Sequence, residues 1–341
     1  MIYVGCRLGG NMKRSLYIYN NGTLRRHDNT LQFINEDGVA RDIPIETVEE
    51  IYVMSEMDFN VSLITILSKY GIVVHFFNYY EFYTGSFYPR EKLQAGHLLV
   101  RQVDHYTNQE KRMVLAKKFV EGAADNIYRN LRYYNSRGKD LSQEMNKIDD
   151  IRKCIGKSNS IQELMGYEGN IRKIYYASWT TIIDQDIDFK KRVRHPPDNM
   201  INTLISFVNT LIYTKVLSEI YRTQINPTIS YLHEPGVRRF SLSLDISEIF
   251  KPILADRLIF SLLNKKRITS KSFTKQLNYL HLTKDASQVI VSELDKRLQT
   301  TIQHKELKKQ VSYQYLIRLE CYKLEKHLLE EKEYEPFRIW W

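Results

Sequence analysis

The repeat of apolar residues along this 341-residue chain changes once, near residues 84–89, and that change constrains the fold more than any other feature. Before this segment, apolar and β-branched residues come in short runs separated by turn residues, a pattern typical of strands. After it, apolar residues recur every three or four positions, which indicates helices with one buried face. The sequence therefore predicts an α+β fold, with a small N-terminal β-rich domain, residues 1–88, followed by a larger all-α domain, residues 89–341.

The first domain contains four segments whose β-branched and aromatic content predicts strands. They are residues 15–19, 30–34, 48–54 and 72–78. Asn21-Gly22 follows the first segment, and Asn-Gly favours the tight turn of a β-hairpin, so residues 15–19 and 24–26 are predicted to pair. Asp37-Gly38 predicts a further turn, and residues 60–69 predict a short helix packed on the sheet.

The second domain contains three long amphipathic segments. They are residues 110–132, a segment that starts at Asp198 after Pro196-Pro197, and residues 313–328. A further segment carries Asp245 and Glu248, which lie three positions apart and share one face if the segment is helical. Pro252 follows them within the same apolar pattern and removes a backbone hydrogen bond. Either the helix kinks at Pro252, or the two carboxylates lie in a first turn before the main helix.

Basic residues exceed acidic ones, since 50 Lys and Arg against 40 Asp and Glu give a formal net charge of +10. This excess favours a polyanionic partner but says nothing about the fold. The chain also has 24 Tyr. Aromatic rings among cations suit unpaired bases, although most tyrosines of a folded protein are half-buried core residues. Lys265, Lys266, Arg267 and Lys271 form a basic run that is either a solvated face or a contact to a DNA backbone.

Several classes of protein are excluded by the motifs that this sequence lacks. It has no P-loop, no Gly-x-Gly-x-x-Gly segment and no cysteine-based zinc motif, which argues against nucleotide hydrolysis, dinucleotide redox chemistry and zinc-type deamination. Its three cysteines are far apart in the sequence, which indicates a reducing compartment. It shows no uninterrupted apolar run of about 18 residues and no secretory signal. The sequence therefore predicts a cytoplasmic protein.

Four residues, Glu168, His233, Asp245 and Glu248, lie in segments that suggest a metal site. Glu168 opens an amphipathic run at Tyr167-Glu168-Gly169-Asn170, and His233 follows the loop of residues 226–232. Two or three carboxylates with one imidazole suit Mg²⁺ or Mn²⁺ with water left in the coordination shell. Asp245 is either a direct ligand, a residue that orients His233, or a helix N-cap.

These segments resemble those of the CRISPR-associated adaptation integrases, the larger, metal-dependent subunit of the complex that inserts spacers into CRISPR arrays. The resemblance covers residues 12–337 and includes residues 194–199, 316–320 and 334–337. In that family the metal is held by a Glu of a Glu-Gly-x-x segment, a His after a Pro-x-x-Gly-x-x-His loop, and an acidic residue three places after an Asp. The resemblance thus implies Glu168, His233 and Glu248 as metal ligands. Ser230 stands where a Gly is usual, which puts the backbone of the His loop in question.

The resemblance also implies the chemistry of this chain. A DNA 3′-hydroxyl is expected to attack a phosphodiester at the repeat boundary, and the same chemistry with water as nucleophile is endonucleolytic nicking. Lys251, three residues after Glu248, is expected to hold a phosphate and thus to act in catalysis with Asp245. The other predicted DNA contacts are Arg172, Arg192, Arg194, Lys265, Lys266, Arg267 and Lys271.

The partners implied are double-stranded DNA with free 3′ ends and CRISPR repeat DNA in the cytoplasm of a prokaryote. A homodimer through the N-terminal domain and a small ferredoxin-like subunit are also implied. Tyr79, Tyr80, Phe82 and Tyr83 add to the expectation of a dimer, because about 80 residues do not easily bury so many aromatic rings. The alternative is a basic, noncatalytic DNA-binding assembly subunit whose acidic residues are structural.

Overall fold

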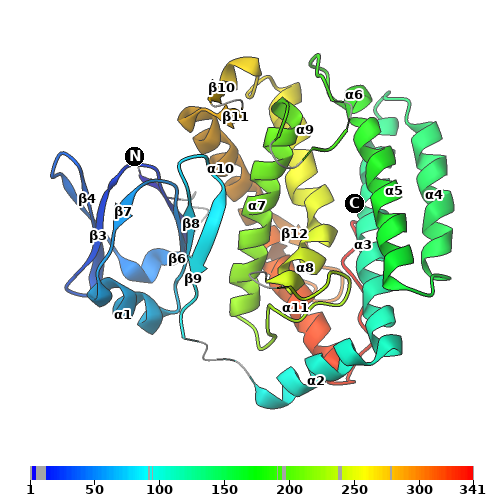
Figure 1. The fold of residues 1–341 in the computed structure, drawn as a ribbon, viewed down its shortest axis with the longest axis horizontal. Coiled ribbons are helices and arrows are strands. Elements are labelled where there is room, and N and C mark those ends of the chain that lie inside the picture. The colour runs from blue at the N-terminus through cyan, green and yellow to red at the C-terminus, as the bar shows by residue number, and fades with distance from the viewer. Residues whose placement is uncertain are drawn as a thin grey trace. The chain divides into compact units, whose positions relative to one another are not determined.

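The computed structural model describes residues 2–4, 13–90, 93, 95–189, 191–193, 197–236, 240–276 and 279–340, with only the backbone for residues 2–4, 276 and 279. They divide into two compact units (Figure 1). One unit comprises residues 1–92 and 284–300, and the other comprises residues 93–283 and 301–341. A β-rich N-terminal region followed by a mostly helical region confirms the predicted α+β fold. The predicted division into residues 1–88 and 89–341 had placed residues 284–300 in the second part.

Two sheets form the first unit. The five-stranded sheet has the order β1 (Ile2–Val4), β2 (Arg14–Ile18), β6 (Val48–Val53), β8 (Val73–Phe77) and β9 (Tyr83–Phe87). The four-stranded sheet has the order β5 (Ala40–Ile43), β4 (Thr30–Asn35), β3 (Gly22–His27) and β7 (Met57–Asp58), and η1 (Ile45–Thr47) leads into β6. Apolar side chains of both sheets and of α1 (Val61–Tyr70) form one core. The predicted strands and the helix near residues 60–69 are therefore confirmed.

The predicted hairpin between residues 15–19 and 24–26 is wrong. Strand β2 is paired on one side with β1 and on the other with β6, so neither edge is left for β3. The chain instead crosses to the second sheet, where β3 pairs with β4. Gly22 lies at this crossing, and a Cβ atom there would stand 2.1 Å from the carbonyl oxygen of Ile34. The glycine therefore serves a close approach of two strands and not the predicted tight turn.

Helix α10 (Lys284–Gln299) belongs to the first unit although it follows most of the helical region in sequence. The hydroxyl groups of Tyr19 and Ser287 lie 3.1 Å apart, and the Lys284 ammonium donates to the side-chain oxygen of Asn20 at 3.1 Å. These contacts join residues more than 260 positions apart. No local sequence pattern predicts that α10 packs on the N-terminal strands.

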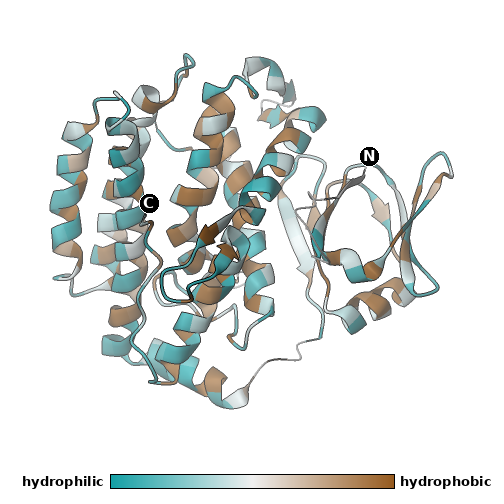
Figure 2. Ribbon diagram, turned by 180° about the vertical axis from the view of Figure 1, so that it is seen from behind, coloured by the Kyte–Doolittle hydropathy of each residue, from teal (hydrophilic) through white to brown (hydrophobic). Residues whose placement is uncertain are grey.

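The second unit consists mainly of helices. They are α2 (Gly96–Thr107), α3 (Gln109–Asn135), α4 (Ser142–Ile155), α5 (Ile161–Ala177), α6 (Trp179–Ile182), α7 (Met200–Tyr221), α8 (Ser241–Lys251), α9 (Arg257–Asn264) and α11 (Tyr313–Leu328). A turn η3 (Ser270–Ser272) and two short ribbons, β10 (Phe273–Gln276) with β11 (Tyr279–Leu282) and β12 (Thr301–Gln303) with β13 (Gln310–Ser312), complete it. The three long predicted helices are confirmed as α3, α7 and α11. Hydrophobic residues are more frequent on the inner helices than on the outer helix α4 (Figure 2).

Helix α7 lies in the core of this unit. It is long and apolar enough to cross a membrane by length and composition alone, but 72% of its most apolar stretch is buried inside the structure. Its N-terminus is capped by Asn199, whose side chain accepts a hydrogen bond from the backbone of Asn202. The apolar stripe that the sequence shows from Ile201 to Ile220 is thus explained by packing against other helices.

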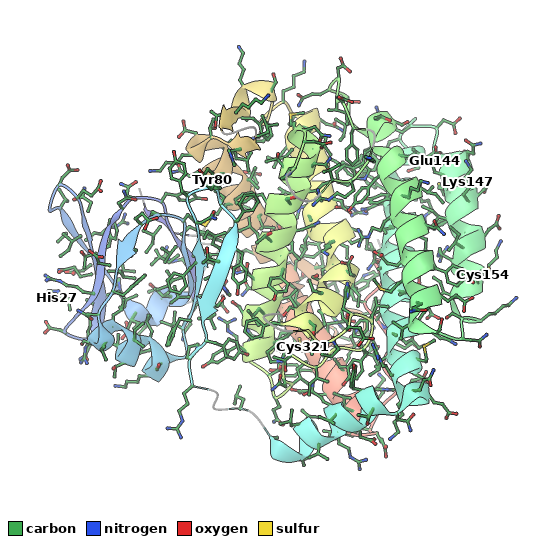
Figure 3. The ribbon with its side chains drawn as sticks, viewed as in Figure 1. His27, Tyr80, Glu144, Lys147, Cys154 and Cys321 are labelled. Carbon is green, nitrogen blue, oxygen red and sulfur yellow. The ribbon has the colours of Figure 1, made fainter. Side chains whose placement is uncertain are left out.

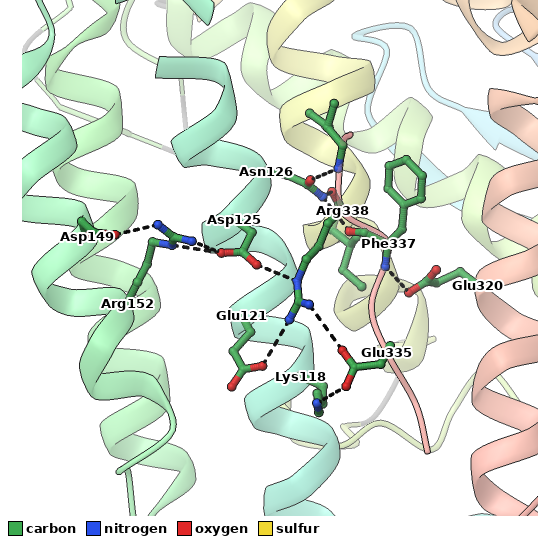
Figure 4. Close-up of polar contacts among 12 residues, drawn as sticks. Lys118, Glu121, Asp125, Asn126, Asp149, Arg152, Glu320, Glu335, Phe337 and Arg338 are labelled. Atoms are coloured by element: carbon green, nitrogen blue, oxygen red, sulfur yellow. Dashed lines mark hydrogen bonds and ion pairs between the residues drawn. The ribbon is translucent and has the colours of Figure 1, made fainter. Parts of the chain in front are cut away.

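The C-terminal segment, residues 329–340, packs against α3 (Figure 4). The side chain of Asn126 on α3 donates to the carbonyl oxygen of Phe337 at 3.0 Å and accepts from the backbone of Ile339 at 2.9 Å. Arg338 forms an ion pair of 2.6 Å with Asp125. Gly122 lies one turn before Asn126, and a Cβ atom there would stand 2.6 Å from Cβ of Pro336. The small face of α3 is therefore required by the close approach of this segment.

We expect Gly122→Ala to lower the free energy of unfolding by about 1–3 kcal/mol, because the added methyl group overpacks the contact with Pro336. The control is Gly166→Ala on α5, where nothing lies within 4 Å of the added atom. That change removes a helix-interior glycine and should stabilise by about 0.5–1 kcal/mol. Urea denaturation of the two variants measures both effects. A Gly122→Ala variant as stable as the wild type would show that the C-terminal segment is not held tightly against α3.

Candidate active site

Helix α8 carries Asp245 and Glu248 on one face, and Pro252 does not end it. The chain passes from α8 into a π-helical segment, Pro252–Asp256, and then into α9. Asn130 of α3 donates its side-chain amide to the carbonyl oxygen of Pro252 at 2.6 Å, which satisfies a backbone group in the irregular stretch. The predicted alternative of carboxylates in a first turn before the main helix is therefore wrong. Both residues lie inside a helix that continues through the irregularity.

Asp245 is buried and accepts four hydrogen bonds from the loop that carries His233. One carboxylate oxygen accepts from the backbone N–H groups of Tyr231 at 2.7 Å and Leu232 at 3.0 Å. The other accepts from the backbone N–H of His233 at 3.0 Å and lies 2.8 Å from Nδ1 of the same residue. Because Asp245 is the fifth residue of α8, it is not an N-cap. Its occupied oxygens favour the orienting role over that of a direct ligand.

The Asp245 contact also sets the state of the His233 ring. With Nδ1–H directed at the carboxylate, the neutral imidazole has its lone pair on Nε2, the arrangement that metal-binding histidines use. Burial by itself lowers the pKa of His233, but the hydrogen bond and charge of Asp245, together with the charge of Glu248, outweigh it, so that the pKa is raised from its ordinary value.

Ser230 fits the loop in place of the usual glycine. Its backbone is not among the described residues with positive φ, so glycine is not required at this position. Its hydroxyl donates to the carbonyl oxygen of His233 at 2.6 Å and thereby closes the turn. The departure from the family pattern is compensated by a side-chain hydrogen bond.

Gln102 on α2 and Arg112 on α3 hold the same loop and were missed from the sequence. Gln102 accepts from the backbone N–H of Asn226 at 2.7 Å and donates to its carbonyl oxygen at 3.2 Å. Arg112 donates to the carbonyl oxygen of Tyr231 at 2.9 Å and forms an ion pair with Glu234 at 2.6 Å. The sequence predicts no helix over residues 96–107, so it offers no signal that Gln102 is buried there.

Glu168 and Glu248 are joined by one guanidinium group. Glu168 lies in the middle of α5, so the prediction that it opens a helix is wrong. Arg172, one turn later, donates Nε to Glu168 at 3.0 Å and Nη2 to Glu248. Lys251 donates to the other oxygen of Glu248. All four side chains are at most 21% exposed, which strengthens these ion pairs relative to pairs in water.

The charge of Glu248 is stabilised despite its burial. Burial alone raises the pKa of this carboxyl group, but the charges of Lys251 and Arg172 and the hydrogen bond from Lys251 lower it to about 2. His233 contributes to the same lowering. Glu248 therefore stays ionised across the physiological pH range and lies within electrostatic range of the imidazole.

The side chains of Glu168, Glu248 and His233 are of the chemical types that bind a divalent cation. Two carboxylates and an imidazole nitrogen with a free lone pair suit Mg²⁺ or Mn²⁺. In the part of the chain that the structure describes, however, no three acidic, His or Cys side chains are grouped closely enough to hold an ion. Arg172 and Lys251 instead occupy oxygens of Glu168 and Glu248. Because both oxygens of Glu248 accept from these cationic groups, an ion at Glu248 would have to displace one of them.

Asp256 at the end of the π-helical segment is a further acid near Arg172, and the sequence reasoning did not select it. It is 1% exposed, and its Oδ2 has no hydrogen-bond partner among the described residues. Burial raises the pKa of Asp256 to about 7, against the opposing effects of Arg172 and of a hydrogen bond with Tyr175. An acid within the apolar run Ile253-Leu254-Ala255-Asp256 was the available signal.

Apart from Lys251, which contacts Glu248, the predicted DNA contacts that the structure describes differ in their exposure. Lys265, Lys266, Arg267 and Lys271 follow α9 and are exposed. Arg192 is instead half-buried and donates to the side chains of Asn202 at 3.1 Å and Ser206 at 2.8 Å, so it ties its loop to α7. Arg172 is buried between carboxylates. Arg194 lies outside the described residues.

Both cysteines that the structure describes are free. Cys154 is on α4 and Cys321 is buried on α11 (Figure 3). Burial raises the pKa of the Cys321 thiol well above its ordinary value, which makes it unreactive. Neither cysteine lies in the candidate site.

Comparison with known proteins shows the family. Residues 16–296 match the family described as CRISPR associated protein Cas1. The chain is 64% identical over 336 residues to the CRISPR-associated endonuclease Cas1 of Fusobacterium nucleatum, covering 98% of this chain and 99% of that protein. It is 42% identical to the CRISPR-associated endonuclease Cas1 of Pyrococcus horikoshii, covering 96% and 99%. The chain belongs to the Cas1 family.

Solved structures agree with this assignment. The Cas1 structure of Thermotoga maritima is 39% identical, has a TM-score of 0.86 and covers 95% of this chain and 99% of its own. A casposase bound to integration product is 21% identical, has a TM-score of 0.84 and covers 95% and 93%, which shows a shared fold. The resemblance that the motifs around Glu168 and His233 suggested is thus confirmed.

In this Cas1 protein we expect Asp245→Asn to lower the pKa of His233, because the hydrogen bond and charge that raise it weaken while burial remains. The variant should also lose about 1–3 kcal/mol of stability, since a buried backbone donor loses its acceptor. NMR titration of the histidine ring measures the pKa, with Asp149→Asn on α4 as the control. An unchanged His233 pKa would contradict the assigned contact.

The raised pKa of His233 determines whether its contribution to the free energy of unfolding grows or falls with pH. A group whose folded-state pKa exceeds its unfolded value of about 6.5 stabilises the fold below that value, and this contribution is lost as the pH rises through the folded-state pKa. The wild type should therefore gain stability from protonated His233 at low pH relative to Asp245→Asn. Urea denaturation of the wild type and of Asp245→Asn, at pH values below and above about 6.5, measures the difference in free energy of unfolding.

Proposed function

We propose that this chain is a metal-dependent DNA endonuclease and integrase that inserts spacer DNA into CRISPR arrays by attack of DNA 3′-hydroxyl groups on phosphodiester bonds. The observation that carries the proposal is the meeting of Glu168 and Glu248 at Arg172, within electrostatic range of His233 as Asp245 orients it. The relatives named above are endonucleases by name, and a protein of the same fold is bound to an integration product. Such a role serves antiviral defence.

Glu168, Glu248 and Nε2 of His233 would hold Mg²⁺ or Mn²⁺. When bound, such an ion stabilises negative charge on the phosphodiester and lowers the pKa of the attacking hydroxyl. Asp245 holds His233 in the tautomer that binding requires. Lys251 and Arg172, released from Glu248, are the cationic groups at hand for the phosphate oxygens. We therefore assign Arg172 and Lys251, which are buried beside the carboxylates, to stabilising the negative charge of the phosphate.

DNA binding is assigned to the exposed basic cluster of Lys265, Lys266, Arg267 and Lys271. These side chains come from the end of α9 and from η3, and Arg267 also interacts with other parts of the chain. Flexible exposed cations suit contacts to phosphates and not to bases. The expected partners are double-stranded DNA with free 3′ ends and CRISPR repeat DNA.

Assembly is assigned to the first unit, as a homodimer that joins a small ferredoxin-like subunit. Tyr79 is 73% exposed and Phe82 is 38% exposed on the turn between β8 and β9. Tyr83 is instead used within the sheet, where its hydroxyl lies 2.8 Å from that of Ser86. A solved protein of this fold is a Cas6-RT-Cas1–Cas2 complex, which shows that the fold occurs in such assemblies. Exposed aromatic rings on one turn support a protein partner there.

We expect Glu248→Gln, Glu168→Gln and His233→Ala each to reduce strand transfer by about 100-fold or more, because each removes a ligand of the cation that would stabilise the developing negative charge. The assay joins a short duplex with free 3′ ends to a supercoiled plasmid bearing the repeat, with Mg²⁺ or Mn²⁺ and the small subunit present. Glu163→Gln, an exposed residue at the start of α5, is the control. Retained joining in all three variants would refute the assigned metal ligands, whereas no joining by the wild type would favour the noncatalytic alternative.

Neutralising Lys265, Lys266, Arg267 and Lys271 together should weaken binding to unrelated duplexes about equally. The slope of log K against log salt should fall by up to about 0.9 for each phosphate that the protein no longer neutralises. Fluorescence anisotropy at several salt concentrations measures both quantities. The control removes Lys147 and Lys153 from α4, and its effect is compared per charge. A changed sequence preference with an unchanged slope would contradict the assignment.

A further inference from the structure

One buried guanidinium lies among three carboxyl groups. Arg172 is 8% exposed, and the charges of Glu248, Glu168 and Asp256 all act on it. Its Nε and Nη2 are taken by Glu168 and Glu248. Its Nη1 is buried without a hydrogen-bond partner among the described residues, and so is Oδ2 of Asp256. A buried donor and a buried acceptor, each with unused hydrogen-bonding capacity, therefore lie within electrostatic range of each other.

Cation binding, as proposed above, creates a problem for Arg172. Both oxygens of Glu248 are taken, by Arg172 and by Lys251, so the oxygen that holds the guanidinium would have to release it to bind an ion. A buried guanidinium that loses its partners is an uncompensated charge, and its burial prevents water from replacing them. Until a DNA phosphate is bound, Arg172 thus needs another acceptor in the ion-bound state. Tyr176 lies within range, but its hydroxyl is neutral and supplies no compensating charge.

We propose that Asp256 is a positioning residue that receives Arg172 when Glu168 and Glu248 turn to the cation. The inference rests on the proposed function, because it assumes a cation at those two carboxylates. Asp256 would hold the displaced guanidinium beside the site, where it can still act on a phosphate. In this way Asp256 contributes to cation affinity without touching the ion.

The surroundings of Asp256 support this role over a structural one. A buried carboxyl with one unpartnered oxygen destabilises a fold, and an Asn would better serve a purely structural hydrogen bond with Tyr175. The segment that carries Asp256 is π-helical and is held by Asn130 at the carbonyl of Pro252. Asp256 therefore has a fixed place from which to accept Arg172.

The test is Asp256→Asn, which keeps the shape and removes the charge. Binding of Mn²⁺ is measured by electron paramagnetic resonance at mildly alkaline pH, and thermal unfolding is measured without metal. We expect Mn²⁺ affinity to fall about tenfold, as for residues that support metal ligands, while the melting temperature without metal is unchanged or higher. The control is Glu219→Gln on α7, another buried acid, which is saturated by Arg318, Arg222 and Gln314. That change should lower the melting temperature and leave Mn²⁺ affinity unaltered.

The outcomes separate this inference from the proposed function. Wild-type Mn²⁺ binding that Glu248→Gln abolishes but Asp256→Asn leaves unchanged would overturn the inference and leave the function standing. Wild-type protein that binds no Mn²⁺ through Glu248 would overturn both. If Asp256→Asn does not fold, a crystal structure of the wild type with Mn²⁺ decides. An ion pair between Arg172 and Asp256 is the expected result, and Arg172 still bound to Glu248 would refute the proposal.

Discussion

The buried carboxylate of Asp245 is the group on which the arrangement of this site depends. It accepts three backbone N–H groups of the His loop and the ring of His233, so one side chain of α8 fixes both the path of a loop and the tautomer of its histidine. Backbone donors buried in a loop are costly unless they are paired. The loop residues 231–233 form no helix or strand, and Asp245 supplies the pairing that secondary structure supplies elsewhere.

Next to this loop, the buried charges of Glu248, Lys251 and Arg172 compensate one another. Glu248 is ionised because it pairs with Lys251 and Arg172. Arg172 in turn is held by Glu168 on α5 and Glu248 on α8, and the charge of Asp256 also acts on it. Removing any member leaves a buried charge without compensation, which costs more than a surface ion pair is worth. A protein that only needed a stable core would be better served by apolar residues there. The cation site proposed for Glu168, Glu248 and His233 would give these charges a function.

Helix α3 packs against both the C-terminal segment and the helical segment that carries the candidate site. Its small and amide-bearing face, Gly122, Asn126 and Asn130, receives the C-terminal segment and contacts the carbonyl groups of α8 and of the π-helical segment. Asn126 is shared, because its amide donates to Ile249, next to Glu248, as well as to Phe337. The end of the chain is thereby coupled to the backbone of the helix that carries the candidate site. The irregular backbone near Pro252 is tolerated in the core because Asn130 donates to the Pro252 carbonyl oxygen.

The sequence alone determined three long helices, the main strands of the first unit, the family and the candidates for a cation site. The period of apolar residues predicted α3, α7 and α11, and the segments around Glu168 and His233 predicted the family, since both are local patterns read over a few residues. The tertiary structure decided which strands pair, that α10 returns to the first unit, and that Arg172 joins Glu168 to Glu248. Strand β2 could not pair with β3 because its edges were taken, and edge occupancy is not encoded beside either strand. Likewise, Asp245 and Asp256 are similar acids in one helical run, and only their buried partners, or the lack of them among the described residues, distinguish their roles.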